Sequence, residues 1–100
     1  MTNTATLSFT DNTLYVEGIV DFNTVVTLRD QGDQWLRTQA PSPCHLDFSR
    51  ITHCNSAATT LLLSWLRTAK HVDKIATIEQ VSPALRSLMD LGGLENLLST

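Results

Sequence analysis

This chain of 100 residues contains little that would point to a membrane span, a secreted scaffold or a phosphate-binding enzyme. No apolar run approaches the roughly 20 residues that cross a bilayer, and residues 1–12 lack the basic and apolar regions of a signal peptide. Two cysteines are too few for a disulfide framework. The glycines form neither a phosphate loop nor a nucleophile elbow. A soluble cytosolic protein without a cofactor is the simplest interpretation.

Charge is also sparse and slightly acidic. Charged residues make up 17% of the chain and hydrophobic residues 42%, a composition typical of a folded globular domain. The formal net charge of -3 gives no general attraction for nucleic acid. Acidic residues gather in residues 1–33, whereas basic residues gather in residues 50–74. This asymmetry either orients a protein partner or belongs to an ordinary solvated surface.

The hydrophobic periodicity predicts the element order ββαβαβα in one domain, residues 1–100. Residues 4–9 and 14–17 alternate apolar with polar, which predicts a β-hairpin whose second strand ends at Gly18. The further strands and helices are predicted at 22 or 23 to about 37, 44–48, 56–71, 75–79 and 82–91. We therefore expect an α/β fold, with a mixed sheet of about four strands and helices mainly on one face.

The first and last predicted helices each have an apolar face that we expect to be buried. In the first helix these positions are Phe22, Val25, Val26, Leu28, Trp35 and Leu36. Asp21 or Asn23 can cap this helix by accepting from a free amide of its first turn. In the last helix, which begins at Ser82-Pro83 and stops at Gly92-Gly93, they are Leu85, Leu88, Met89 and Leu91. A terminal turn is predicted at Leu94, Leu97 and Leu98.

The central helix, residues 56–71, has two distinct faces on a helical wheel. The face expected to pack on the sheet contains Ala58, Leu61, Leu62, Trp65, Leu66 and Ala69. The opposite face carries a stripe at spacings of four, three and four, formed by Ser56, Thr60, Leu63 and Arg67. One apolar side chain among hydroxyls and a guanidinium suits a small protein interface. A lone exposed leucine is nevertheless common, so an ordinary solvated face stays open.

Ser56 has two interpretations. Its side-chain oxygen, or that of Asn55, can cap the central helix by accepting a hydrogen bond from a free backbone amide. Alternatively, the amides and the helix dipole stabilise an anion there, either a phosphate on Ser56 or a partner's carboxylate. The sequence favours capping over the second interpretation.

Two other groups of residues suggest chemistry only weakly. Cys44-His45 and His53-Cys54 have metal-binding side chains, but neighbours on a strand point to opposite faces, so we expect no metal site. Asp47, Ser49 and His53 are the residue types of a catalytic triad, without any accompanying motif. We therefore expect that the protein is not an enzyme.

Several motifs, in order along the chain, resemble those of the STAS domain family. These are GIVD at 18–21, LDFS at 46–49, NSAAT at 55–59, ALR at 84–86 and LGGL at 91–94. The family pattern has (I/L)DLS on a strand and D-S/T-S/G-G-L at the start of the next helix. The resemblance covers nearly the whole chain and implies the STAS fold. The family includes anti-sigma factor antagonists and the small cytosolic subunit of bacterial Mla phospholipid transporters.

Two departures from the family pattern bear on function. Anti-sigma factor antagonists are switched by phosphorylation of the second of two adjacent hydroxyl residues, a position occupied here by Ala57. The acidic residue that precedes the pair is replaced by Asn55. Ser56-Ala57-Ala58 is more similar to the transporter subunits, which keep the first hydroxyl and follow it with a small residue. Phosphorylation of Ser56 itself remains an alternative.

The resemblance implies a protein that binds the ATPase of an ABC transporter and supports its activity. Such a transporter moves phospholipids and maintains the lipid asymmetry of the outer membrane. The implied location is the cytoplasm, peripheral to the inner membrane through the transporter. The residues expected to contact the ATPase are Asn55, Ser56, Thr59, Thr60, Leu63 and Arg67.

Overall fold

The computed structural model describes residues 4–97, and its elements follow the predicted order ββαβαβα with a short 3-10 helix after them. They are β1 Ala5–Phe9, β2 Thr13–Val20, α1 Val25–Thr38, β3 Cys44–Cys54, α2 Ser56–His71, β4 Ala76–Val81, α3 Pro83–Leu91 and η1 Glu95–Leu97. The predicted bounds of the central helix are confirmed. Within the described residues, no helix is both long and apolar enough to cross a membrane.

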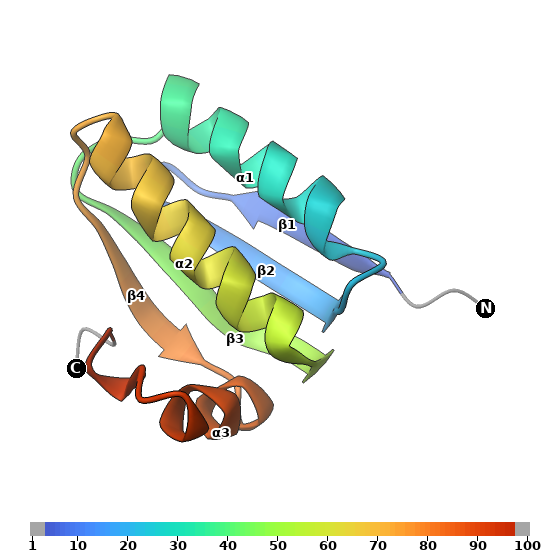
Figure 1. Ribbon diagram of the computed structural model, residues 1–100. Helices are drawn as coiled ribbons and strands as arrows, with labels where there is room; N and C mark the ends of the chain where they lie inside the picture. The colour runs from blue at the N-terminus through green and yellow to red at the C-terminus, as the bar shows by residue number, and fades with distance from the viewer. Residues whose placement is uncertain (1–3, 98–100) are drawn as a thin grey trace.

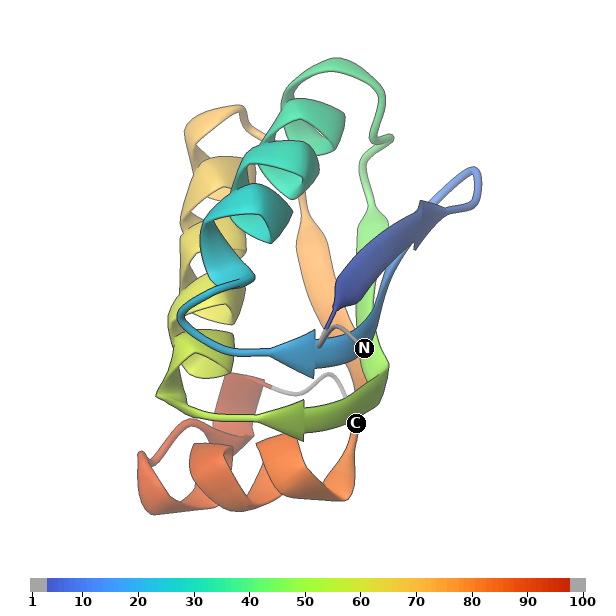
Figure 2. The same cartoon turned by 90° about the vertical axis from the view of Figure 1, so that its right-hand side faces the viewer.

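The strands form a mixed sheet in the order β1-β2-β3-β4 (Figure 1). β1 and β2 are antiparallel, whereas β2, β3 and β4 are mutually parallel neighbours. Figure 2 shows α1 and α2 side by side on one face of the sheet, while α3 lies across one end. The predicted α/β class, mixed sheet and one-sided helix layer are therefore confirmed. The ends of β2 and β3 lie side by side, as shown by the amide of Asn55, which donates to the carbonyl of Val20 at 3.2 Å.

The core lies between the sheet and the two helices that cover it. From α2 it receives the face predicted by the wheel, although Leu66 is only half-buried. The largest fully buried side chains include Trp65, Phe48, Leu36, Leu46, Leu62 and Leu85. The rings of Trp65 and Phe48 pack with centroids 5.8 Å apart, which joins α2 to the central strand β3. Leu85 and Met89 of α3 belong to the same core cluster.

The prediction that Gly18 ends the second strand is wrong. β2 continues to Val20, and Gly18 lies within it with a φ of 105°. The pairing of β2 with β3 shifts register between Gly18 and Ile19, which is the signature of a β-bulge. A Cβ at Gly18 would overlap the carbonyl oxygen of Thr4, the residue that precedes the neighbouring strand β1. The glycine therefore permits a close approach inside the sheet and does not stop the strand.

The start of the first helix also differs from the prediction. α1 begins at Val25, and Phe22 is 69% exposed, so it lies outside the buried face; Val26 is exposed as well. Asp21 acts one turn earlier than an N-cap: its carboxylate accepts from the amides of Asn23 and Thr24 at 2.9 and 3.1 Å. This turn, closed by the Asp21 side chain, directs Phe22 to solvent before the helix begins.

Three smaller differences concern element ends. β3 extends to Cys54 and not only to residue 48, because Ile19 and Val20 of β2 pair with its last residues. β4 runs over Ala76–Val81 and leaves Ile75 outside. Leu91 is 87% exposed, so it does not belong to the buried face of α3. Leu98 of the predicted terminal turn lies outside the described residues.

Candidate partner-binding surface

Asn55, and not Ser56, caps the central helix. Its backbone is extended, and its side-chain oxygen accepts from the amide of Ala57 at 2.8 Å. Among residues 4–97, the Ser56 hydroxyl has no hydrogen-bond partner, and the residue is exposed. Because the capping role is already filled, the Ser56 hydroxyl is free to donate to and accept from another molecule.

The hydroxyls of Thr59 and Thr60 both point back along the first turn of α2. They donate to the carbonyl oxygen of Ser56 at 2.8 and 3.2 Å. This bonding satisfies their protons locally and leaves their oxygen lone pairs as acceptors. The predicted polar residues of the corner are therefore together at one helix end, but Thr59 is half-buried, whereas Ser56 and Thr60 are exposed.

The predicted stripe Ser56, Thr60, Leu63 and Arg67 is exposed along its whole length, with Leu63 38% exposed. Its last three members line one side of a groove of about 280 Å³ between α1 and α2. The groove is completed by Val25, Arg29, Leu61 and Ser64. The stripe is thus one wall of a groove, and the other wall, on α1, was not predicted from the sequence.

The groove is positively charged at its rim. Arg29 and Arg67 both line it. The guanidinium of Arg29 lies 3.4 Å from the carboxylate of Asp30, but both side chains are well exposed, so this pair contributes little. Within the described residues Arg67 has no ion-pair partner. A groove with an apolar wall and two guanidiniums suits a partner segment that carries both apolar and acidic side chains.

Comparison with known proteins now identifies the family. A family model described as "Mlab, STAS domain" matches residues 4–99. The chain belongs to the STAS domain family. STAS domains mediate protein–protein interactions. No curated protein matches the chain.

Solved structures of STAS proteins share this fold. One is the anti-sigma factor antagonist SpoIIAA in its unphosphorylated form, with a TM-score of 0.73, 21% sequence identity, and coverage of 94% of this chain and 84% of that chain. Another is the Bacillus cell fate determinant SpoIIAA in its phosphorylated form, with a TM-score of 0.67, 21% identity, and coverage of 94% and 87%. At this identity the likeness establishes the fold.

In this STAS domain the residue after Ser56 faces the interior. Ala57 is 1% exposed, and Ala58 is fully buried. A larger or charged side chain at Ala57 would therefore have to displace its neighbours or leave the helix face. The exposed hydroxyl nearest the helix N-terminus is that of Ser56.

The cysteine and histidine residues that the structure describes in this STAS domain do not form a cluster that could bind a metal ion. Within residues 4–97, no three potential metal ligands come together. Cys44 is buried, whereas the Nδ1 atom of His45 lies 2.9 Å from a carboxylate oxygen of Glu79. Burial raises the pKa of the Cys44 thiol above its ordinary value, and it does the same for the pKa of Cys54.

The residues that resemble a catalytic triad are also arranged differently. The Asp47 carboxylate accepts from the amide of Ser49 at 2.8 Å and from its hydroxyl at 2.6 Å, within β3 where the pairing with β2 shifts register. In the described part of the chain, no hydrogen bond joins His53 to either residue. Because Ser49 bonds to Asp47 and not to His53, the three residues do not have the serine–histidine–aspartate arrangement of a triad.

Proposed function

We propose that this STAS domain is a non-catalytic subunit that binds and supports the ATPase of an Mla-type ABC transporter. That transporter moves phospholipids and maintains the lipid asymmetry of the outer membrane, and the subunit lies in the cytoplasm, peripheral to the inner membrane. The observation that carries the proposal is the free, exposed hydroxyl of Ser56 followed by the buried Ala57. The family description supports the transporter assignment over other STAS roles.

The proposed contact surface extends from the helix N-terminus to the groove. Ser56 donates to an acceptor of the ATPase, and Asn55, Thr59 and Thr60 hold the first turn in place. Leu63 provides the apolar anchor, which is the type of contact that dominates small interfaces. Arg67 pairs with an acidic side chain of the ATPase. ATP hydrolysis belongs to the partner.

The test is co-purification of the chain with the ATPase subunit of an Mla-type transporter from the same cell. We expect Leu63→Asp to weaken binding by at least about 2 kcal/mol, or roughly 30-fold, because it places a carboxylate at the apolar anchor. Ser56→Trp is expected to block the helix end in the same way. Leu91→Asp is the matched control, because Leu91 is an exposed leucine on α3.

Circular dichroism must show that all three variants keep their helices. The proposed surface is wrong if Leu63→Asp and Ser56→Trp bind the ATPase as tightly as the unmodified chain. It is also wrong if Leu91→Asp weakens binding as much as Leu63→Asp, since the loss would then not be local to the groove.

An anti-sigma factor antagonist, or another partner-switching regulator controlled by phosphorylation, is the second candidate. It is favoured by the exposed Ser56 hydroxyl at a helix N-terminus, where the helix dipole would stabilise the negative charge of a phosphate. The shared fold with SpoIIAA is consistent with it. Labelling of Ser56, Thr59 or Thr60 by a kinase from the same cell, with release of a bound partner, would favour this role over the transporter.

A further inference from the structure

The outer edge of β1 lacks the charged and proline residues that commonly protect an edge strand. Among residues 4–97, no strand pairs with this edge, which Figures 1 and 2 show at the border of the sheet. The sequence of β1 is ATLSF, without charge or proline. Edge strands of soluble proteins commonly carry lysine, proline or an inward-pointing charge that discourages pairing. The edge is therefore open to another strand.

The hydrogen bonds of the hairpin show which backbone groups of β1 point outward. The amide of Thr10 donates to the carbonyl of Thr13 at 2.9 Å, and the amide of Ile19 donates to the carbonyl of Thr4 at 3.1 Å. Even-numbered residues of β1 are therefore bonded to β2. Because the pattern alternates in an antiparallel pair, the amides and carbonyls at Ala5, Leu7 and Phe9 point to the outer edge.

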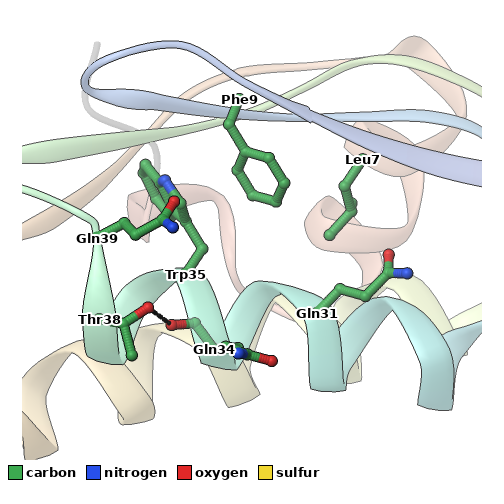
Figure 3. Close-up of a pocket in the computed structure, with 7 residues that line it drawn as sticks. All are labelled: Leu7, Phe9, Gln31, Gln34, Trp35, Thr38 and Gln39. Carbon is green, nitrogen blue, oxygen red and sulfur yellow. Dashed lines mark hydrogen bonds between the residues drawn. The ribbon is translucent and has the colours of Figure 1, made fainter.

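Two of these odd-numbered residues also line a groove beneath α1. The groove has a volume of about 370 Å³ and is lined by Leu7, Phe9, Gln31, Gln34, Trp35, Thr38 and Gln39 (Figure 3). Phe9 is exposed, although its ring packs on that of Trp35 with centroids 5.4 Å apart. A strand added to β1 would send alternate side chains into this groove, because residues on one face of a sheet recur at every second position.

We propose that β1 pairs with β1 of a second copy of this chain in an antiparallel arrangement. The two-fold axis passes through Leu7, so that Leu7 opposes its own counterpart and Ala5 opposes Phe9 of the other copy. This register pairs all the outward backbone groups of β1 and joins the two sheets into one. It also covers Phe9 with the facing strand.

The chemistry of the groove favours a second copy over an unrelated partner. None of the residues that line it in the described part of the chain is charged. The outward stripe of α1, at spacings of four, three and four, consists of Thr27, Gln31, Gln34 and Thr38. A two-fold axis brings each surface against itself, so a charged groove would repel its own copy, whereas amides and hydroxyls both donate and accept. The α1–α2 groove, with two arginines at its rim, is unsuited to the same pairing.

The dimer leaves the proposed ATPase-binding surface open. Val25 and Arg29 line the α1–α2 groove, whereas Gln31, Gln34 and Thr38 line the groove above β1. On a helix these two sets lie on opposite sides. One dimer would therefore present two copies of the α1–α2 groove, both on the helix-covered face of the joined sheet.

Sedimentation equilibrium of the full chain over a wide concentration range tests the dimer. Figure 3 places Gln31 at the Leu7 end of the groove, near the proposed axis. We expect Gln31→Glu to weaken dimerisation at least about tenfold, because it brings two carboxylates together. Gln80→Glu is the matched control, since Gln80 is an exposed glutamine on β4 at the opposite edge. A mixture of Gln31→Glu and Gln31→Lys chains is expected to form a heterodimer.

Hydrogen exchange tests the register independently of charge. As the concentration rises, the amides of Leu7 and Phe9 should gain protection, whereas those of Thr6 and Ser8 should change little because β2 already holds them. The proposal is overturned if the chain stays monomeric at every concentration. It is equally overturned if Gln31→Glu, folded by circular dichroism, dimerises like the unmodified chain, or if protection appears away from β1.

Discussion

The substitution Gly32→Ala should destabilise the protein, although glycine in the middle of a helix is normally unfavourable. Gly32 is buried in α1 where that helix crosses α2. A Cβ at this position would overlap Cε2, Cζ2 and Nε1 of Trp65. The indole is fully buried, and its Nε1 donates to the carbonyl of Arg29 at 3.3 Å. It cannot swing aside without losing that bond.

Three effects set the size of the change. Alanine is favoured over glycine in a helix interior by about 1 kcal/mol. Overpacking a rigid core costs about 1–3 kcal/mol, and the upper end applies here because the obstacle is a buried ring. Loss of the hydrogen bond from Trp65 to Arg29 adds about 1 kcal/mol. The net loss of unfolding free energy is therefore about 3 kcal/mol at most and about 2 kcal/mol if the hydrogen bond survives.

Urea unfolding followed by tryptophan fluorescence measures this change, because Trp35 and Trp65 are both buried. We expect a lower midpoint with an unchanged slope, and a melting temperature lowered by about 4–8 °C per kcal/mol. Gly92→Ala is the matched control, since a Cβ there would approach Leu88 no closer than 3.5 Å. A Gly32→Ala variant as stable as the unmodified chain would refute the overlap with Trp65.

Two further predictions concern the helix cap and the thiols. Asn55→Ala should lower the unfolding free energy by about 1 kcal/mol, because it removes the acceptor for the Ala57 amide. Asn55→Asp should not lower it, because a carboxylate keeps that acceptor. Urea unfolding of both variants checks this prediction. Burial raises the pKa of the Cys44 and Cys54 thiols, so the folded chain keeps those protons to a higher pH than the unfolded chain does. The free energy of unfolding should therefore not depend on these thiols below their ordinary pKa of 9.0, and it should fall as the pH rises above that value. A Cys44→Ala/Cys54→Ala variant with an equally steep decline would contradict that origin.

The parts of the fold that the sequence predicted well are those where one periodicity dominates. The bounds and buried face of the central helix follow from apolar residues at helical spacing, and Asn55 and the Ser82-Pro83 pair mark two helix starts. The exposed stripe from Ser56 to Arg67 follows from the same wheel. These features depend on residues close together in the chain.

The errors arise where long-range contacts override local signals. Gly18 resembles a strand terminator, but the neighbouring carbonyl of Thr4 requires a glycine inside the strand. Residues 49–53 look like a loop, yet the extended end of β2 pairs with them. Phe22 fits the helical spacing of α1 but is turned out by the Asp21 turn.

The second wall of the α1–α2 groove was missed for the same reason. Arg29 is the single basic residue in residues 1–33, which could have drawn attention to it as a binding residue. Its position in the sequence, however, does not show that it lies beside Arg67 of the other helix. That proximity depends on how closely α1 and α2 pack. Gly32 determines this distance, because its missing side chain admits the indole of Trp65.

The close packing at Gly32 therefore links stability to the proposed binding surface. Trp65 donates to the carbonyl of Arg29, and Thr68 donates to the carboxylate of Asp33 at 2.9 Å, so both helices are joined beside the groove. Pushing the helices apart with Gly32→Ala should widen the groove and weaken ATPase binding together with stability. Leu63→Asp should weaken binding while stability is kept. Comparison of the two variants separates the shape of the groove from the apolar contact that it presents.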